Sequence, residues 1–308
     1  MRTRRRSGDD ADRLRAAYRA ADDAGDHVEA ERLAWQVVAA DPSDHVFWFD
    51  LALFAKRRRD WPEALRLNAR ALEVGPGDVE QNPAGWNLGI AATALGDWEQ
   101  ARRGWRAFGV RVPDGDGPIT MRLGMIPVRL NPADTDLVAE PLAIDGVVHA
   151  TEVVWAERLS PAHARVVNVP SPDSGHRYGD VVLTDGVPHG QRFDGRAWVS
   201  VFDELLLLAR SAWVTWTVDV EARDASDADA LTALAEDRGL AAEDWTANLH
   251  LLCRACSEGR PGDEHQHETA WVPSRRFGVA GDADQVRALL GDWAEADGRV
   301  VGPVTRSL

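Results

Sequence analysis

The chain has 308 residues, of which 44% are hydrophobic and 28% are charged, a composition that excludes an intrinsically disordered protein and, at this length, predicts two domains. Its net charge of −15 comes entirely from the part after residue 112. Residues 1–112 contain 18 basic and 18 acidic residues, whereas residues 113–308 contain 17 basic and 32 acidic residues. An acidic surface of this kind repels phosphate and anionic lipid, so we expect no nucleic-acid or membrane partner.

The chain contains no apolar run long enough to cross a membrane, and Met1 is followed by arginines rather than by an apolar leader. This pattern predicts a protein of the cytoplasm. Its two cysteines, Cys253 and Cys256, are therefore expected to serve chemistry or metal binding rather than a structural disulfide.

The first third of the chain repeats with a period of 34 residues, which separates Pro42 from Pro76 and Ala30 from Ala64. Each repeat is predicted to contain two helices joined by a short turn. A proline ends the second helix, because it lacks an amide hydrogen and disfavours helix in the residue before it. The repeats cover residues 14–42, 48–76 and 86–112, the third displaced by a three-residue insertion at Gln81-Asn82-Pro83.

The third repeat carries Trp86-Asn87-Leu88-Gly89, then Ala92 and Gly96-Asp97-Trp98-Glu99-Gln100-Ala101, which is similar to the tetratricopeptide pattern. Residues 11–112 therefore resemble three repeats of the tetratricopeptide repeat family. The resemblance implies an all-α stack of helical hairpins whose concave face binds an extended or helical segment of another protein. Carried over residue by residue, that face includes Arg15, Arg19, Asp22, Phe49, Leu53, Lys56, Trp86, Ile90 and Thr93.

Two features of this face have a second interpretation. The chain's own C-terminal module is an alternative occupant of the groove, because a stack of only three repeats needs a cap at its open end. The run Lys56-Arg57-Arg58-Arg59 is either a clamp for a partner's carboxylate or a solvated helix end. We favour the helix end, because helix C-termini attract cations.

A linker rich in proline, glycine and aspartate at residues 113–118 separates the repeats from an acidic module at residues 119–308. In this module β-rich runs alternate with turn signals and two helices follow, which predicts an α+β module with an antiparallel sheet or a small barrel. The predicted strands are residues 120–130, 147–158, 163–169, 178–184 and 213–221, the predicted helices are 227–238 and 283–296, and the predicted turns include Asp145-Gly146, Asp185-Gly186 and Asp194-Gly195.

The segment from Glu152 to Tyr178-Gly179-Asp180-Val181-Val182 resembles an uncharacterised bacterial domain in which a strand, a turn and a second strand form a small barrel. Asp173, His176 and Asp180 within this segment suggest a catalytic triad. However, no serine or cysteine lies beside a base, and no G-x-S-x-G motif is present. We therefore interpret these three side chains as polar turn residues.

Two thiols and two imidazoles occur close together late in the chain. Cys253 and Cys256 precede a turn rich in glycine and proline, and His265 and His267 follow it. These ligand types suit a tetrahedral zinc ion, which would be structural because four protein ligands leave no open position for water. The alternatives are a buried pair of apolar thiols and solvated histidines in a loop.

Together these patterns favour a protein-interaction scaffold or adaptor that is not an enzyme. The acidic module would either cap the repeats or, as in an immunity or inhibitor protein, offer an acidic surface to a basic partner. The alternative is a metal-dependent enzyme with its site at Cys253, Cys256, His265 and His267, which would need an open metal position beside a general base.

Overall fold

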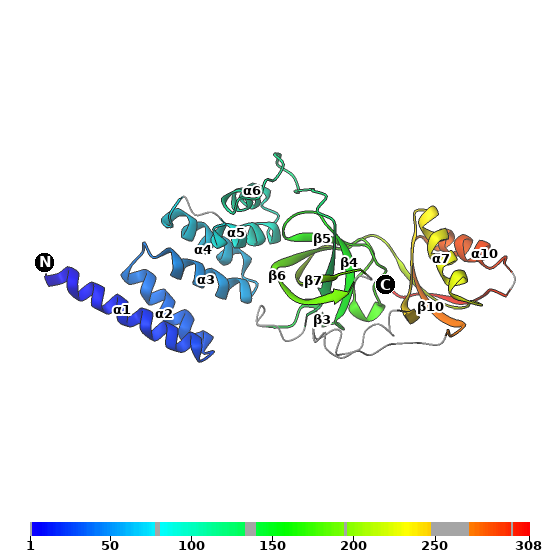
Figure 1. Cartoon of the computed structure of the whole chain (residues 1–308), viewed down its shortest axis with the longest axis horizontal. Coiled ribbons are helices and arrows are strands. Elements are labelled where there is room, and N and C mark those ends of the chain that lie inside the picture. The colour runs from blue at the N-terminus through cyan, green and yellow to red at the C-terminus, as the bar shows by residue number, and fades with distance from the viewer. Residues whose placement is uncertain (1, 78–80, 133–139, 194–195, 248–270, 297) are drawn as a thin grey trace. The chain divides into compact units, whose positions relative to one another are not determined.

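The structure of the chain is a computed structural model (Figure 1) that describes every residue except 1, 78–80, 133–139, 194–195, 248–270 and 297. The chain divides into two compact units. The first runs from Met1 to Met121, and the second takes nearly all residues from Arg122 to Leu308. No helix in the described part of the chain is long and apolar enough to cross a membrane.

The first unit is a series of helices that pack in consecutive pairs. Helix α1 packs against α2, α3 against α4, and α5 against α6, so that helical hairpins follow one another along the chain. The starts of α2 and α4 lie 34 residues apart, which confirms the predicted tetratricopeptide-type architecture. The helices are α1 (Arg2–Asp23), α2 (His27–Ala40), α3 (His45–Arg57), α4 (Trp61–Val74), α5 (Pro83–Ala94) and α6 (Trp98–Ala107).

An aspartate begins the second helix of each hairpin. The carboxylates of Asp26, Asp60 and Asp97 accept hydrogen bonds from the backbone amides three residues further on. Such N-caps each stabilise a helix by about 1 kcal/mol. They explain why the turn recurs at the same place in every hairpin.

Helices α5 and α6 approach each other closely because glycines lie at their contact. A Cβ at Gly89 would lie 2.6 Å from ring carbons of Trp105, and a Cβ at Gly104 would lie 2.6 Å from the backbone nitrogen of Gly89. The Trp105 side chain is fully buried as a result.

The predicted linker segment is held against α6. Arg102 Nε donates to the carbonyl oxygen of Pro113 at 2.9 Å, and its Nη2 donates to that of Gly117 at 2.8 Å. These hydrogen bonds fix the path of the chain where it leaves the helical hairpins.

The second unit contains a closed barrel, as the sequence predicts. Its strands follow the order β1-β4-β5-β6-β7, and every pairing is antiparallel except that of β1 with β7, which closes the barrel. The core includes Val128, Leu130, Val154 and Val182. The strands are β1 (Met125–Leu130), β4 (Glu152–Arg158), β5 (His163–Val166), β6 (Val181–Phe193) and β7 (Trp198–Ala209).

A short hairpin precedes β4. Strands β2 (Ala143–Ile144) and β3 (Val147–Val148) pair through a turn with positive φ at Asp145 (53°) and Gly146 (79°). The predicted turn at these two residues is therefore confirmed.

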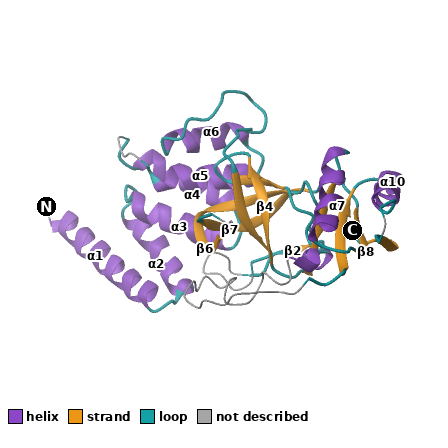
Figure 2. Cartoon of the chain, turned by 45° about the vertical axis from the view of Figure 1, so that its right-hand side comes forward, coloured by secondary structure: helices purple, strands orange, loops and turns teal. Residues whose placement is uncertain are grey.

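A second sheet, with four strands in the described residues, follows the barrel along the chain and carries two helices (Figure 2). Its order is β11-β8-β10-β9, with antiparallel pairing throughout. The helices bury Leu231, Leu289 and Trp293 against Val218 and Phe277 of the sheet. The elements are β8 (Thr215–Glu221), α7 (Ala225–Asp237), β9 (Ala241–Asp244), β10 (Ser274–Ala280), α10 (Ala283–Trp293) and β11 (Val300–Arg306).

The structure differs from the sequence prediction at several strands. Strand β6 runs through the predicted turn at Asp185-Gly186, where the Asp185 carboxylate accepts hydrogen bonds from the amides of Gly186 and Val187. That turn prediction is wrong, because β6 continues through these residues to Phe193, with a shift in its register against β7 between Thr184 and Pro188. Strands β7, β9, β10 and β11 were not predicted, and the predicted turn at 194–195 lies outside the described residues.

Candidate functional site

The first unit contains a cavity of about 290 Å³ that is lined by residues of α1, α3 and the start of α2. Three residues predicted for partner binding, Asp22, Leu53 and Lys56, line it together. The other lining residues, which the family pattern does not indicate, are Tyr18, His27, Asp50, Phe54 and Arg57.

Asp50 is a partly buried carboxylate in this cavity. Burial raises its pKa to about 6, although a hydrogen bond with Tyr18 opposes the shift. Burial also raises the pKa of Tyr18, so that its hydroxyl stays protonated and donates to Asp50. The Tyr18 ring packs edge-on against Phe47 at 4.8 Å between centroids. The predicted residue Phe49 precedes Asp50 on α3, is half-buried and does not line the cavity.

The basic run at the end of α3 makes contacts within the unit. Lys56 is buried, and its Nζ donates to Asn87 Oδ1 at 3.0 Å. Arg58 donates to both carboxylate oxygens of Glu31 at 2.5 and 2.9 Å. The interpretation of this run as a solvated helix end is therefore wrong for Lys56, because Lys56 is buried and joins α3 to α5.

Arg15 is bound by carboxylates of its own unit. Its guanidinium donates to Asp12, Asp41 and Asp44 at distances from 2.8 to 3.1 Å. These hydrogen bonds tie α1 to the turn between α2 and α3. Arg19, one turn later, is exposed, and its Nε donates to the backbone oxygen of Arg15 at 3.3 Å. Neither arginine lines the cavity.

The predicted residues on α5 also lie outside the lining of this cavity. Trp86 packs edge-on against Trp105 and Phe108, with centroids 5.1 and 4.7 Å away. Ile90 and Thr93 are buried. Of the predicted residues, the structure thus brings together Asp22, Leu53 and Lys56 at the cavity, and it assigns Trp86 a packing contact with α6.

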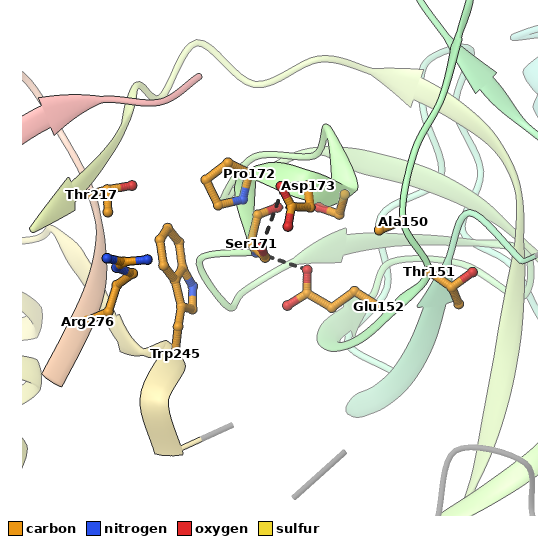
Figure 3. Close-up of a pocket in the computed structure, with 10 residues that line it drawn as sticks. Ala150, Thr151, Glu152, Ser171, Pro172, Asp173, Thr217, Trp245 and Arg276 are labelled. Carbon is orange, nitrogen blue, oxygen red and sulfur yellow. Dashed lines mark hydrogen bonds between the residues drawn. The ribbon is translucent and has the colours of Figure 1, made fainter. Parts of the chain in front are cut away.

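A second cavity, of about 400 Å³, lies in the second unit between one end of the barrel and the second sheet (Figure 3). The barrel side supplies Glu152, at the start of β4, and the 3₁₀ turn η1 (Pro172–Ser174). The sheet side supplies Thr217, Trp245 and Arg276. The remaining lining residues are Ala150, Thr151 and Ser171.

Glu152 is a titratable group at this second cavity. Its Oε2 accepts a hydrogen bond from the backbone amide of Ser171 at 2.9 Å. Burial raises its pKa to about 7, and the negative charge of Glu243 adds to the shift. Glu152 also lines a neighbouring cavity of about 130 Å³ together with Glu243, Asn168 and Arg192.

A buried charge network lies beside the second cavity. His176 Nδ1 lies 3.3 Å from Asp180 Oδ2 and its Nε2 lies 3.1 Å from Glu204 Oε2, with all three side chains fully buried. Burial lowers the pKa of His176, but its interactions with the carboxylates of Asp180 and Glu204 outweigh burial and raise the pKa to about 9. Asn131 connects the network to the cavity wall. Its backbone amide donates to Glu204 Oε2 at 3.0 Å, and its Nδ2 donates to the backbone oxygens of Ala150 and Ser174.

This network corrects the interpretation of the Asp173, His176 and Asp180 set. Asp180 does accept the backbone amide of Arg177 within its turn, as expected of a polar turn residue, but His176 and Asp180 are also buried and form an ion pair inside the unit. Asp173 is separate from them, exposed on η1 at the second cavity. The third member is Glu204, which the sequence analysis missed because strand β7 itself was not predicted.

The predicted zinc ligands Cys253, Cys256, His265 and His267 lie outside the described residues, and zinc binding there stays a prediction. Within the described ranges, no group of three or more histidine, cysteine, aspartate and glutamate residues is placed to hold a metal ion.

No family model and no curated protein matches this chain. Among solved structures, a mutant O-GlcNAc transferase from Thermobaculum terrenum is 24% identical over 33% of this chain and 19% of its own, with a TM-score of 0.29. The TPR2B domain of yeast Sti1 in complex with pHsp70 is 19% identical over 32% of this chain and 76% of its own, with a TM-score of 0.28. A hypothetical protein from Neisseria gonorrhoeae is 13% identical over 58% of this chain and 93% of its own, with a TM-score of 0.24. This chain thus spans less than one fifth of the transferase's length.

Proposed function

We propose that this protein is an interaction scaffold or adaptor whose first unit binds a segment of another protein. The observation that carries the proposal is the cavity lined by α1 and α3, which combines exposed Asp22 and Leu53 with buried Tyr18 and partly buried Asp50. Energetically important residues of protein interfaces fill pockets of this kind, where apolar contact and hydrogen bonding occur together.

The lining chemistry favours a partner side chain that is apolar along its length and donates a hydrogen bond at its tip. Leu53 and Phe54 supply apolar contact, while Asp22 and Asp50 supply acceptors. Arginine, lysine and tryptophan combine these properties. Lys56 and Arg57 also line the cavity, so the two carboxylates act as hydrogen-bond acceptors within a lining whose charges balance.

The second unit adds an electrostatic preference to this proposal. The acidic excess after residue 112, with 32 acidic and 17 basic residues, favours a basic partner and speeds its approach. We therefore extend the proposal to an inhibitor-like or immunity-like role. In it, the repeats at 11–112 dock the partner, and the module at 119–308, joined by the linker 113–118, offers the acidic surface.

A photocrosslinking amino acid at Leu53 tests the proposal in the native host. Leu53 is 38% exposed, so benzoylphenylalanine is accommodated there without disturbing the core. The matched control is the same amino acid at Gln36, which is exposed on α2 and does not line the cavity.

We expect a discrete crosslinked partner protein from position 53 that is absent from position 36. Adding Asp22→Lys should reduce its yield, because the charge reversal repels a cationic anchor. The same products from both positions, or none from position 53, would contradict the proposal.

A further inference from the structure

The walls of the 400 Å³ cavity in the second unit are fixed by hydrogen bonds between the barrel side and the sheet side. Trp245 Nε1 donates to the backbone oxygen of Val169 at 2.8 Å, and Asn168 Nδ2 donates to Glu243 Oε2 at 2.8 Å. The Trp245 ring also packs tightly on β10, where a Cβ at Gly278 would lie 2.1 Å from it. The cavity is therefore preformed, and its volume falls in the range typical of small-molecule sites.

The cavity is acidic. Glu152 and Asp173 contribute two carboxylates to the lining. Among the lining residues that the structure describes, Arg276 is the only cation, and its guanidinium donates to both oxygens of Asp219 at 2.8 and 3.3 Å. These four groups leave an excess of negative charge, which favours a positively charged ligand.

Glu152 and Trp245 lie on opposite walls, and the carboxylate of Glu152 points toward the indole ring (Figure 3). Burial disfavours the charged form of Glu152, as its pKa of about 7 reflects. A bound cation would restore that charged form. The face of an indole ring attracts cations as well. A carboxylate and an indole across one cavity are the groups that stabilise an ammonium or guanidinium ion removed from water.

We propose that this cavity binds a small organic cation whose alkylammonium or alkylguanidinium group lies between the Glu152 carboxylate and the Trp245 ring. Pro172 contacts the alkyl stem, and the hydroxyl oxygen of Ser171 accepts a remaining N–H group. The site lies wholly within the second unit, so it does not depend on partner binding by the first.

Isothermal titration of the full chain with n-butylguanidinium and n-butylammonium tests the proposal, with neutral n-butanol as the uncharged probe. We expect both cations to bind and n-butanol not to bind. Glu152→Gln should weaken cation binding about tenfold or more, because it removes a charge-assisted hydrogen bond. Glu157→Gln, at the other end of β4 and paired with Arg165, should leave binding unchanged.

Absence of cation binding to the wild-type chain, or equal binding by Glu152→Gln, would overturn the proposal. If Glu152→Gln fails to fold, the exposed variant Asp173→Asn replaces it, with weaker cation binding expected and unchanged binding contradicting the proposal. A lysine blocked at its backbone amine and carboxyl distinguishes the sources of the cation. Its binding would indicate a lysine side chain of a polypeptide, and binding of the butyl cations alone would indicate a free amine.

Discussion

The indole nitrogen of Trp293 donates a hydrogen bond to the backbone oxygen of Asp227 at 2.9 Å, which fastens α10 to α7. The carboxylate of Asp227 is buried and pairs with Arg223 and Arg299, each at 2.8 Å. Arg299 in turn lies over the Trp293 ring, with its guanidinium carbon 5.1 Å from the ring centroid. One aspartate therefore joins both helices to the segment that enters β11.

Replacement of Asp227 by asparagine should lower the stability of the second unit at neutral pH and weaken its sensitivity to acid. Hydrogen bonds from Arg223 and Arg299 hold the pKa of Asp227 well below its usual range. A depressed pKa contributes stability that is present above the usual carboxyl pKa and is lost as the pH falls toward the folded-state value. Thermal unfolding between about pH 7 and about pH 3 measures the effect.

Asp229→Asn is the matched control, because Asp229 is exposed on the same helix. It should unfold as the wild type does at every pH. Equal acid sensitivity of the wild type and Asp227→Asn would show that the pairing contributes nothing.

The raised pKa of His176 predicts that the second unit loses stability as the pH rises. Its folded-state pKa is raised from 6.5 to about 9, because Asp180 and Glu204 outweigh the effect of burial. The stability that the imidazolium contributes is fully present below the unfolded pKa and is lost as the pH rises through the folded value. His176→Gln should therefore unfold at lower urea than the wild type at neutral pH and show a flatter dependence above it.

Urea unfolding at neutral pH and above the pKa of His176 measures this difference. His45→Gln, at an exposed position on α3, is the control and should match the wild type. A wild-type stability that stays constant across this range would refute the buried imidazolium.

Alanine substitutions of two helical glycines should have opposite effects on stability, because only one of the two glycines lies at a close contact between helices. Gly89→Ala should destabilise the first unit by about 1–3 kcal/mol, because the new methyl group overlaps the Trp105 ring. Gly291→Ala, on α10, meets no neighbouring atom within 4 Å and should stabilise its helix by about 1 kcal/mol. Chemical unfolding of the two variants compares them, and a stabilising Gly89→Ala would contradict the packing.

The helical hairpins could be predicted from the sequence because the signals that form them are local and repeat. The caps Asp26, Asp60 and Asp97 each act within their own turn, and small residues such as Gly89 recur where helices meet. Both the capping residues and the small residues recur with the repeat, so the period of 34 residues is visible in the sequence itself.

The missed strands of the second unit lack such local signals. Strand β7 carries Asp203 and Glu204 side by side, both buried, so its alternation of apolar and polar residues is interrupted. Strand β10 carries Arg275 and Arg276 near its start, and their charges are neutralised by Asp244 and Asp219, which lie far away in the sequence. Only the folded sheet supplies these partners.

The candidate site of the first unit could be predicted in part. The family pattern indicates Asp22, Leu53 and Lys56, but not Tyr18 and Asp50, whose hydrogen bond joins two helices. Tyr18 stands four residues before Asp22 and so lies on the same face of α1, which was the available signal. The cavity of the second unit had none, because its lining residues come from separate strands and turns.

The affinity of the crosslinked partner for single-leucine variants tests the central claim most directly. Leu53 and Leu95 are comparably exposed, at 38% and 44%, but only Leu53 lines the cavity of the first unit. In titrations of the purified partner, Leu53→Ala should raise Kd about tenfold or more, as removal of an anchoring contact does. Leu95→Ala should leave Kd unchanged. An unchanged Kd for Leu53→Ala, or an equal loss for both variants, would contradict binding at this cavity.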